Sequence, residues 1–307
     1  MITRFKAALA LVLALVVALA LPVAAPAAKG DEKDKREKQF YVSLGDSYST
    51  GYQPGPGGAP GTSTKDGYAY KLPKLAKKKN YDLKLVNFGC GGETTTSLLE
   101  RTTPCPGPAI NGPNYDGRTQ IAAAESFIKK HRKAVEVVTV SIGGNDITSC
   151  VNTPDPVSCV VQRMPEVEAR IKTIMERLRS AAGRKVTIVG LTYPDVILGL
   201  YTGGSQEEKD FAALSVVAFR DFINPALKRA YESQAGIFVD VTADTDAYIP
   251  FEQTTNFPPY GEIPVAVATV CRITYYCERR DIHANAEGYL IIARLIADAL
   301  PKVKKTK

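Results

Sequence analysis

Four short blocks of the sequence contain residues that could together carry out acyl transfer. They are Gly45-Asp-Ser-Tyr-Ser49, Asn87-Phe-Gly-Cys-Gly-Gly-Glu-Thr-Thr95, Gly143-Gly-Asn-Asp146 and Asp281-Ile-His283. A serine hydroxyl is a weak nucleophile until a base takes its proton. Glycine N–H groups approach a substrate oxygen closely because no side chain intervenes, and an asparagine amide can donate to the same oxygen. The blocks therefore offer a nucleophile, a base and donors for an oxyanion.

The chain holds two histidines, and only one of them suits a general base. His131 lies in the basic run Lys129-Lys-His-Arg-Lys133, which we interpret as a solvated helix end. His283 directly precedes a predicted helix and is the remaining candidate. The alternative is that His283 is a neutral histidine whose hydrogen bonds are satisfied at the helix start. The corresponding alternative for Ser47 is a serine that caps a turn. For the Gly143-Gly-Asn-Asp146 block, it is a tight turn that caps the following segment.

Short β-branched runs and longer helical patterns alternate along the chain and must position these blocks. Strands are predicted at residues 40–44, 83–87, 135–142, 185–191 and 236–240. Helices are predicted near residues 66–79, 119–132, 163–182, 206–234 and 285–300. Because strands joined by crossover helices run parallel, we expect a three-layer α/β/α sandwich with about five parallel strands. Ligands of such sheets bind beyond the carboxyl ends of the strands, where the first three blocks stand.

In this order and at these positions, the four blocks resemble those of the SGNH hydrolase (GDSL esterase/lipase) superfamily. The resemblance covers essentially the whole body of the chain, and the cysteine-bearing loops are most similar to the secreted actinomycete branch. It implies a flavodoxin-like fold in which Ser47 is the nucleophile and His283 its base. It also implies an oxyanion hole formed by the N–H of Ser47, the N–H of Gly92 and the side chain of Asn145. We interpret Asp46 as structural, with a carboxylate that accepts nearby backbone N–H groups.

The last block departs from the family pattern in one respect. The common pattern has an aspartate three residues before the histidine, whereas Arg280 stands there and the aspartate, Asp281, lies two residues before His283. Asp281 is therefore a candidate third member of a catalytic triad that needs a different loop. The alternative is a Ser–His dyad in which a backbone carbonyl near Arg280 orients the imidazole. The sequence leaves both open, and we expect the dyad.

Composition and charge exclude several other classes of function. Two histidines cannot build a His-rich metal site, and no two cysteines have zinc-ribbon spacing. GxGxxG, GxxxxGK[ST] and GxSxG patterns are absent, so neither a nucleotide cradle nor an α/β-hydrolase elbow is present. The net charge of +7 comes from the two ends, because residues 39–301 hold 28 basic and 28 acidic side chains. We therefore expect no cofactor, no metal and no nucleic-acid partner.

The N-terminus has the pattern of a secretory signal peptide. Two basic residues precede an apolar run from Ala7 to Leu21, and small residues follow it. The alternative interpretation is a membrane anchor, but the apolar run is shorter than a membrane-spanning helix needs. We expect a signal peptide at 1–27, a flexible charged leader at 28–38, the SGNH hydrolase domain at 39–301 and a solvated basic tail at 302–307. The mature protein is then secreted, with no membrane span.

Export gives the six cysteines a structural role, because disulfides form in oxidising compartments. Six cysteines allow 15 connectivities. Their positions suggest pairing inside single Gly/Pro/Asn-rich connections, as Cys90–Cys105, Cys150–Cys159 and Cys271–Cys277.

These observations together predict a monomeric secreted serine esterase or lipase that acts on a small ester or lipid. Alternatives are a carbohydrate-directed O-deacetylase on the same fold and a non-catalytic cell-wall or glycan-binding protein. We expect an apolar acyl pocket built from residues 196–201 and from aromatic residues of the long connection 241–280. The alternative is that these aromatic residues only close the core beneath long loops.

Overall fold

The computed structural model describes residues 39–304. The expected signal peptide, the charged leader and the last three residues of the basic tail lie outside the described residues. Between residues 39 and 304, no helix is both long and apolar enough to cross a membrane. The tail is tied down in part, because the N–H of Val303 donates to the carbonyl of Lys79 at 3.0 Å.

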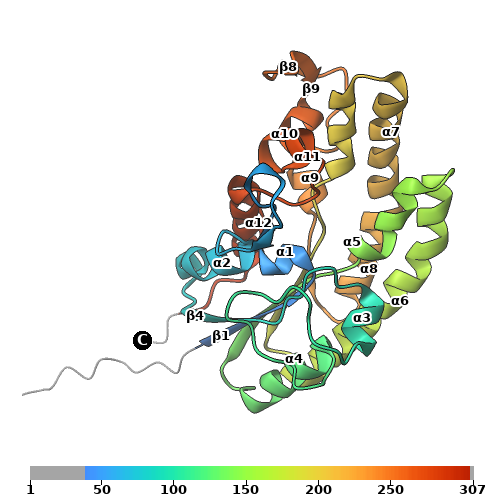
Figure 1. The fold of residues 1–307 in the computed structure, drawn as a ribbon. Coiled ribbons are helices and arrows are strands. Elements are labelled where there is room, and N and C mark those ends of the chain that lie inside the picture. Colours follow the sequence, from blue (N-terminus) through green and yellow to red (C-terminus); the bar gives the residue numbers. More distant parts are fainter. Residues whose placement is uncertain (1–38, 305–307) are drawn as a thin grey trace, which may run out of the picture. The chain divides into compact units, whose positions relative to one another are not determined.

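A parallel sheet of five strands forms the centre of the fold (Figure 1). The strands lie in the order β4-β1-β5-β6-β7, and each neighbouring pair is parallel. Their bounds are Gln39–Gly45 (β1), Leu83–Asn87 (β4), Val135–Ser141 (β5), Thr187–Leu191 (β6) and Ile237–Val239 (β7). All five strands that the sequence predicts are therefore confirmed, and the order places β1 beside both β4 and β5.

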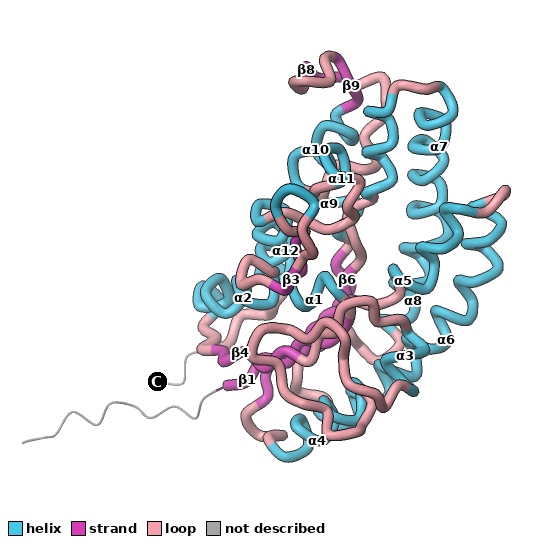
Figure 2. Tube along the Cα trace, viewed as in Figure 1, coloured by secondary structure: helices cyan, strands magenta, loops and turns pink. Residues whose placement is uncertain are grey.

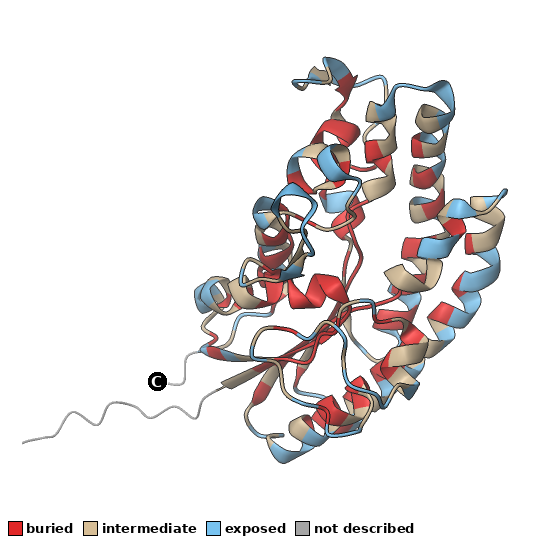
Figure 3. Ribbon diagram, in the orientation of Figure 1, coloured by how far each residue is buried: buried red, intermediate tan, exposed pale blue. Residues whose placement is uncertain are grey.

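Helices cover both faces of the sheet, which confirms the three-layer α/β architecture (Figure 2). One face is covered by α4 (Gln120–Lys130), α6 (Pro156–Ala182) and α8 (Asn224–Glu232), and the other by α2 (Tyr68–Ala76) and α12 (Ala286–Ala299). The buried apolar residues form two clusters, one between each helix layer and the sheet. Figure 3 shows these buried strips lying between the strands and the inward faces of the helices.

The expected helix at 206–234 is present in three consecutive parts. It comprises α7 (Gln206–Val217), a π-helical turn η5 (Ala218–Ile223) and α8. A π-helical turn inside an α-helix often marks a functional site, and this one lines the cavity described below. The α7 segment begins with a capping box, in which the Ser205 hydroxyl accepts from the N–H of Glu208.

The connections contain the other short elements, and all of these except the one between α2 and β4 follow the carboxyl end of a strand. They are α1 (Ser47–Thr50), β2 (Tyr52–Gln53), η1 (Pro56–Gly58), β3 (Thr62–Ser63), η2 (Lys77–Lys79), α3 (Thr95–Glu100), α5 (Gly144–Ile147), η3 (Thr148–Asn152), η4 (Val196–Gly203), α9 (Val241–Asp244), β8 (Thr254–Asn256), β9 (Glu262–Pro264), α10 (Val265–Ile273) and α11 (Tyr276–Arg279).

The long connection 241–280 folds around a small core of its own. The apolar face of α10 is buried there against Leu198 and Ile263. Four aromatic residues of the connection pack around this cluster: Tyr248, Phe251, Phe257 and Tyr260. The expectation that they form an acyl pocket is wrong, because the nearly continuous apolar surface of α10 needs them as cover. The alternative given above, closure of a core beneath a long loop, describes them correctly.

Candidate active site

Ser47 is placed by the sharp end of β1. Gly45 has φ +131°, and a Cβ there would lie 2.0 Å from the carbonyl oxygen of Ser141 on the adjacent strand β5. Only glycine can therefore end the strand in this way. The Gln120 side-chain amide fixes the backbone on both sides of Gly45, accepting from its N–H at 2.8 Å and donating to its carbonyl at 3.0 Å. Ser47 follows as the first residue of α1, beyond the carboxyl end of the strand.

His283 lies directly beside Ser47, although the two are 236 residues apart in sequence. Nε2 of His283 is 2.8 Å from Oγ of Ser47, which is the contact a general base needs. His131 occupies the end of α4 instead, where its ring packs on Phe127 and on Phe40 near the start of β1. It is therefore at the opposite end of the strand from Ser47, and it is packed rather than fully solvated as expected.

Asp281 contacts the other nitrogen of the imidazole. Its Oδ1 lies 2.8 Å from Nδ1 of His283 and also accepts the backbone N–H of His283 at 2.9 Å. The expectation that a backbone carbonyl near Arg280 orients the ring is therefore wrong. With φ 54°, Arg280 takes the left-handed conformation, and the tight turn that follows brings a carboxylate two residues before the histidine within reach.

The pKa of Asp281 lies below its usual range. Burial acts to raise this pKa, but hydrogen bonds from the His283 ring and from the His283 N–H outweigh it, with smaller help from Arg279. The carboxyl group is therefore ionised at neutral pH. A carboxylate in this position favours the tautomer with a proton on Nδ1, which leaves Nε2 free to accept the proton of Ser47.

Two tyrosines that the sequence analysis did not single out also hold His283. The ring of Tyr52 lies 4.3 Å from the imidazole, measured between centroids. The hydroxyl of Tyr48 donates to the carbonyl of Ile282 at 2.6 Å, which fixes the backbone just before the histidine. Both tyrosines come from the segment immediately after Ser47, so Ser47 and the residues that support His283 share one stretch of chain.

A hydrogen bond from Asn145 to the residue after Gly92 connects the segments of these two expected oxyanion donors. The Nδ2 atom of Asn145 donates to the carbonyl of Glu93 at 2.8 Å, one residue beyond Gly92. An amide nitrogen carries two hydrogens, so one N–H of Asn145 is left for a substrate oxygen. Asn145 and Ser47 line the same cavity, whereas Gly92 is not among its lining residues. The carbonyl of Gly45 receives the N–H of Cys90 at 2.9 Å, which holds the glycine loop against the segment leading to Ser47.

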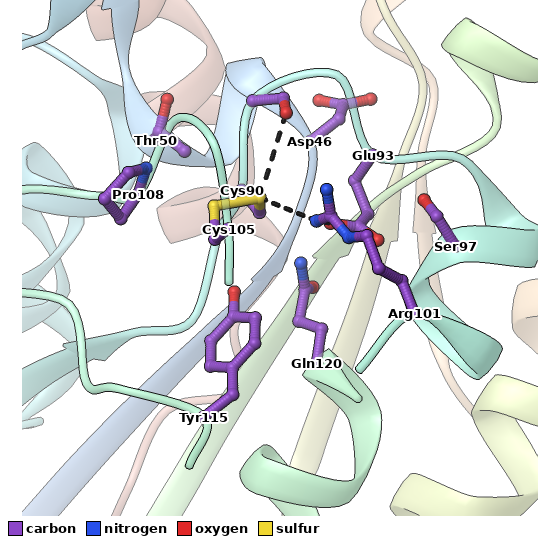
Figure 4. Close-up of a disulfide and its surroundings, with 12 residues drawn as sticks. Asp46, Thr50, Cys90, Glu93, Ser97, Arg101, Cys105, Pro108, Tyr115 and Gln120 are labelled. Carbon is purple, nitrogen blue, oxygen red and sulfur yellow. Dashed lines mark hydrogen bonds and ion pairs between the residues drawn. A yellow bond between two sulfur atoms is a disulfide. The ribbon is translucent and has the colours of Figure 1, made fainter. Parts of the chain in front are cut away.

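Behind the glycine loop lies a buried charged pair that the sequence analysis missed. The guanidinium of Arg101 donates to the carboxylate of Glu93 and, at 2.9 Å, to Sγ of Cys90. Figure 4 shows the Arg101 side chain reaching from α3 toward the Cys90–Cys105 disulfide, with Glu93 beside it. The pKa of Glu93 is raised, because burial outweighs the hydrogen bonds from Ser97 and Arg101. This pair, together with the disulfide, fixes the loop that carries Gly92.

Asp146 connects the segments that carry Gly92 and Asn145, the expected oxyanion donors. Its carboxylate accepts the N–H of Thr95 at 2.9 Å and the Thr95 hydroxyl at 2.5 Å. Because Asp146 follows Asn145 in α5 and Thr95 begins α3, this contact ties the segment of Asn145 to the segment after Gly92. An acidic residue next to the family asparagine was the only sequence signal for this role.

Asp46 has the structural role that the sequence suggests. Its Oδ1 accepts the N–H of Tyr48 at 2.9 Å, and its Oδ2 accepts the hydroxyl of Tyr193 at 2.6 Å. Burial raises the pKa of Asp46 to about 7, against the lowering effect of these two bonds. Asp46 follows β1 and Tyr193 follows β6, so their hydrogen bond links the carboxyl ends of these two strands.

The structure has three disulfides, Cys90–Cys105, Cys150–Cys159 and Cys271–Cys277. These are the pairs that the sequence positions suggest. The first joins the glycine loop to the connection before α4, and the second joins η3 to the start of α6. The third joins α10 to α11, on the segment that leads to His283. Each disulfide therefore constrains a segment that borders the site.

An apolar cavity of about 280 Å³ opens at Ser47 and Asn145. Its volume is close to the lower end of ordinary ligand pockets, about 300–1,000 Å³. The walls come from α5, η3, the first turns of α6, η4, α7 and η5. Val196 and Ile197 line it as expected, but from the connection 241–280 only Tyr276 and Arg280 do so. The sequence analysis missed the contribution of α6, α7 and η5.

Within residues 39–304, no group of three or more His, Cys, Asp or Glu side chains is arranged to bind a metal ion. Ser47 contacts His283, and His283 contacts Asp281, so the polar atoms of the three side chains have partners in one another. This geometry is compatible with acyl transfer, which requires a nucleophile, a base and an orienting carboxylate in such contact.

Comparison with known proteins assigns the family. Residues 43–291 match the model of the GDSL-like lipase/acylhydrolase family. Because this match spans most of the chain, the protein belongs to that family. A sequence search of curated proteins returned no match.

Solved structures share the fold at low sequence identity. The lipase Lip_vut3 from a goat rumen metagenome has a TM-score of 0.51 and 16% identity, covering 85% of this chain and 97% of that chain. Phospholipase A1 from Streptomyces albidoflavus NA297 has a TM-score of 0.47 and 17% identity, with 86% and 100% covered. A family two carbohydrate esterase from Cellvibrio japonicus has a TM-score of 0.42 and 13% identity, with 85% and 59% covered. The first of these supports the assignment of the SGNH hydrolase fold.

Proposed function

We propose that this protein is a serine ester hydrolase in which Ser47 forms an acyl-enzyme and His283 is the general base. The observation that carries the proposal is the contact chain from Ser47 Oγ through His283 to Asp281, with 2.8 Å at each step. Family membership supports ester hydrolysis as the type of reaction. No observation of the described residues favours glycan binding without catalysis.

In the proposed reaction, Ser47 attacks the ester carbonyl and passes its proton to Nε2 of His283. The oxyanion that forms accepts from the N–H of Ser47, the N–H of Gly92 and the free N–H of Asn145. Asp281 stabilises the imidazolium, which then gives its proton to the departing alkoxide, so that the alcohol leaves. Water attacks the acyl-enzyme with His283 again as base, and the products are a carboxylic acid and free Ser47.

A covalent probe and two histidine variants test this assignment. A fluorophosphonate should label the wild-type protein at Ser47, and Ser47→Ala should lose both labelling and hydrolysis of nitrophenyl esters. His283→Ala should lose hydrolysis by a similar factor, whereas His131→Ala is a matched control that removes the other histidine and keeps activity. An active Ser47→Ala protein, or a dead His131→Ala beside a live His283→Ala, contradicts the proposal.

We propose an apolar acyl group as the substrate portion that enters the cavity. The floor consists of buried apolar side chains, among them Val160, Met164 and Leu227. Burying one CH₂ group stabilises by about 0.8 kcal/mol, so longer acyl chains should gain kcat/KM until the floor is reached. A polar acetylated sugar would find few hydrogen-bond partners along these walls, which argues against the O-deacetylase alternative.

A pair of adjacent variants on α6 tests the acyl site. Val160→Phe adds bulk to the cavity floor, whereas Val161, whose exposed fraction is 41%, does not line the cavity. We expect Val160→Phe to lower kcat/KM for a nitrophenyl octanoate at least about tenfold relative to the acetate, while Val161→Phe keeps the wild-type ratio. Equal ratios in both variants, or faster turnover of acetylated sugars than of octanoate by the wild type, contradict an acyl site in this cavity.

We also propose that the protein is secreted and acts as a monomer. The three disulfides and the basic-then-apolar start of the chain support export. N-terminal sequencing of protein recovered from the culture medium should begin after Ala27. Retention of the first 27 residues in a membrane fraction contradicts export with cleavage. Size-exclusion chromatography with light scattering tests the monomer directly.

A further inference from the structure

Arg280 provides the only cationic side chain among the cavity-lining residues of the described chain. The remaining lining residues are apolar or neutral, apart from Asp46, whose carboxylate is engaged by Tyr48 and Tyr193. We propose that Arg280 binds an anionic group, phosphate or carboxylate, on the alcohol half of the substrate. This inference rests on the proposed function, and it assigns a class of ester to that same site.

The guanidinium of Arg280 makes only two long hydrogen bonds to other described residues. Its Nη1 lies 3.5 Å from the carbonyl of Gly199, and its Nη2 lies 3.3 Å from Oε1 of Glu208. The ring of Tyr276 supports it at 5.6 Å from the centroid. A guanidinium has five N–H donors, so three remain for a ligand even when both long contacts are counted. The exposed fraction of the side chain is 45%, so solutes can reach it.

Glu208 competes only weakly for Arg280. The other oxygen of Glu208 accepts the Ser205 hydroxyl at 2.9 Å and the Ser205 N–H at 3.3 Å. The pKa of Glu208 is lowered mainly by these bonds, and Arg280 makes the smallest contribution. The first role of Glu208 is therefore to cap α7, and an incoming anion can take the fork of the guanidinium.

The position of Arg280 relative to the reaction points to the alcohol half of the ester. The departing oxygen must lie beside Nε2 of His283, because that atom returns the proton. Arg280 is three residues before His283, and Ile282 between them also lines the cavity. The acyl floor lies on other elements, chiefly α6 and α8, which carry Val160, Met164 and Leu227. An ester bound with its acyl chain on that floor therefore directs its alcohol half toward the turn that carries Arg280.

The left-handed backbone of Arg280 is a second indication. The residue ends α11 with φ 54°, a conformation that glycine or asparagine adopts at lower cost. Arginine gains nothing from the backbone at this position, because the N–H bond to Tyr276 is available to any residue there. A side chain that contacts substrate explains its presence.

Three octanoyl esters with different alcohol halves test the proposal. They are 1-octanoylglycerol, which is neutral, 1-octanoylglycerol 3-phosphate and O-octanoyl lactate. The variant is Arg280→Gln, and the matched control is Arg279→Gln, which removes the same charge from a side chain that contacts Gly55 and Tyr275 outside the cavity. We expect Arg280→Gln to lower the ratio of kcat/KM for the anionic over the neutral ester about tenfold, through KM, while Arg279→Gln keeps the wild-type ratio.

A loss confined to the phosphate ester identifies phosphate as the recognised group, and a loss confined to the lactate ester identifies carboxylate. Glu208→Gln provides a reciprocal measurement, because glutamine retains the capping box and removes the competing charge. We expect it to lower KM for the anionic ester. Equal ratios for Arg280→Gln and Arg279→Gln overturn the proposal.

Binding without turnover separates this inference from the proposed function. Octyl phosphate and octanol can be titrated into the wild-type protein by calorimetry, with Arg280→Gln as the comparison. We expect octyl phosphate to bind about tenfold more weakly to the variant and octanol to bind both proteins equally. Absence of all ester hydrolysis together with this binding pattern refutes the esterase and keeps the anion site. Hydrolysis of all three esters with no binding difference refutes the anion site and keeps the esterase.

Discussion

The substitution Asp281→Asn measures what the carboxylate next to His283 contributes. A single atom, Oδ1 of Asp281, faces both Nδ1 of the ring and the backbone N–H of His283. The backbone N–H is an obligatory donor, so the atom that faces it must be an acceptor. In the asparagine variant the amide oxygen should therefore take the place of Oδ1. The imidazole then keeps its proton on Nδ1 and its basic nitrogen toward Ser47.

The expected fall in kcat of Asp281→Asn is therefore caused only by the loss of the negative charge beside the imidazolium. A hydrogen bond to a charged group contributes about 1.5–3 kcal/mol. The exposed fraction of the Asp281 side chain is 24%, which allows water to stabilise part of the imidazolium and favours the lower part of that range. A loss of about 1.5–2 kcal/mol corresponds to roughly 10–30-fold in kcat. A triad whose asparagine imposes the wrong tautomer loses about 10⁴ instead.

The assay is kcat for a nitrophenyl ester under saturating conditions, with the pH profile of kcat/KM. Asp281→Ala should lose more than Asp281→Asn, because it removes the orientation of the ring as well as the charge. Glu278→Gln is the matched control, since Glu278 lies in the same loop and, within residues 39–304, has Arg279 at 3.9 Å as its only ion-pair partner. A loss above about 10³ in Asp281→Asn means that the amide has turned and the reasoning is wrong. A loss under threefold means that the carboxylate is idle and a Ser–His dyad operates.

Three further predictions concern the oxyanion hole, a buried carboxyl group and the disulfides. Asn145→Ala should lower kcat by about 10²–10³ with a smaller change in KM, in the same ester assay. Burial raises the pKa of Asp195 to about 7, so the protonated carboxyl group stabilises the fold at low pH and this stabilisation is lost as pH rises toward 7. The melting temperature of Asp195→Asn minus that of the wild type should therefore increase from pH 5 to pH 8. A constant difference contradicts this. Reduction with dithiothreitol should lower activity before circular dichroism shows loss of the sheet, because the disulfides border the site and none of them joins strands of the sheet. Activity and fold lost together contradict that order.

The strands and the residues that follow them were predictable because local sequence determines both. The run before Ser47 includes Phe40, Tyr41 and Val42, residue types that favour strands. It ends at Gly45, whose φ of +131° is readily adopted only by glycine. Alternation of strands and helices then fixes parallel pairing, which brings the ends of β1, β4 and β5 to one edge. Ser47, Gly92 and Asn145 each follow one of these ends, so a local pattern and one topological rule sufficed.

The cavity and the role of Asp281 were not predictable from local sequence. The cavity walls come from α6, α7 and η5, whose apolar residues could equally have faced the core, and aromatic residues of 241–280 were needed to cover α10. The contact of Asp281 depends on one left-handed residue, Arg280, and no sequence pattern requires arginine to adopt that conformation. Both outcomes depend on how distant segments pack, which residue spacing does not specify.

The polar side chains around the proposed site form connections between strand ends that the reaction itself does not require. Asp46 joins the end of β1 to the residue Tyr193 after β6, and Asp146 joins the segment after β5 to the segment after β4. Oxyanion donors contribute to rate only when they are held in place before the reaction, and each donor here lies on a short connection rather than on a strand. Burial opposes the ionisation of Asp46 and raises the pKa of its carboxyl group to about 7. That cost is consistent with connections whose purpose is to fix the relative positions of Ser47, Gly92 and Asn145.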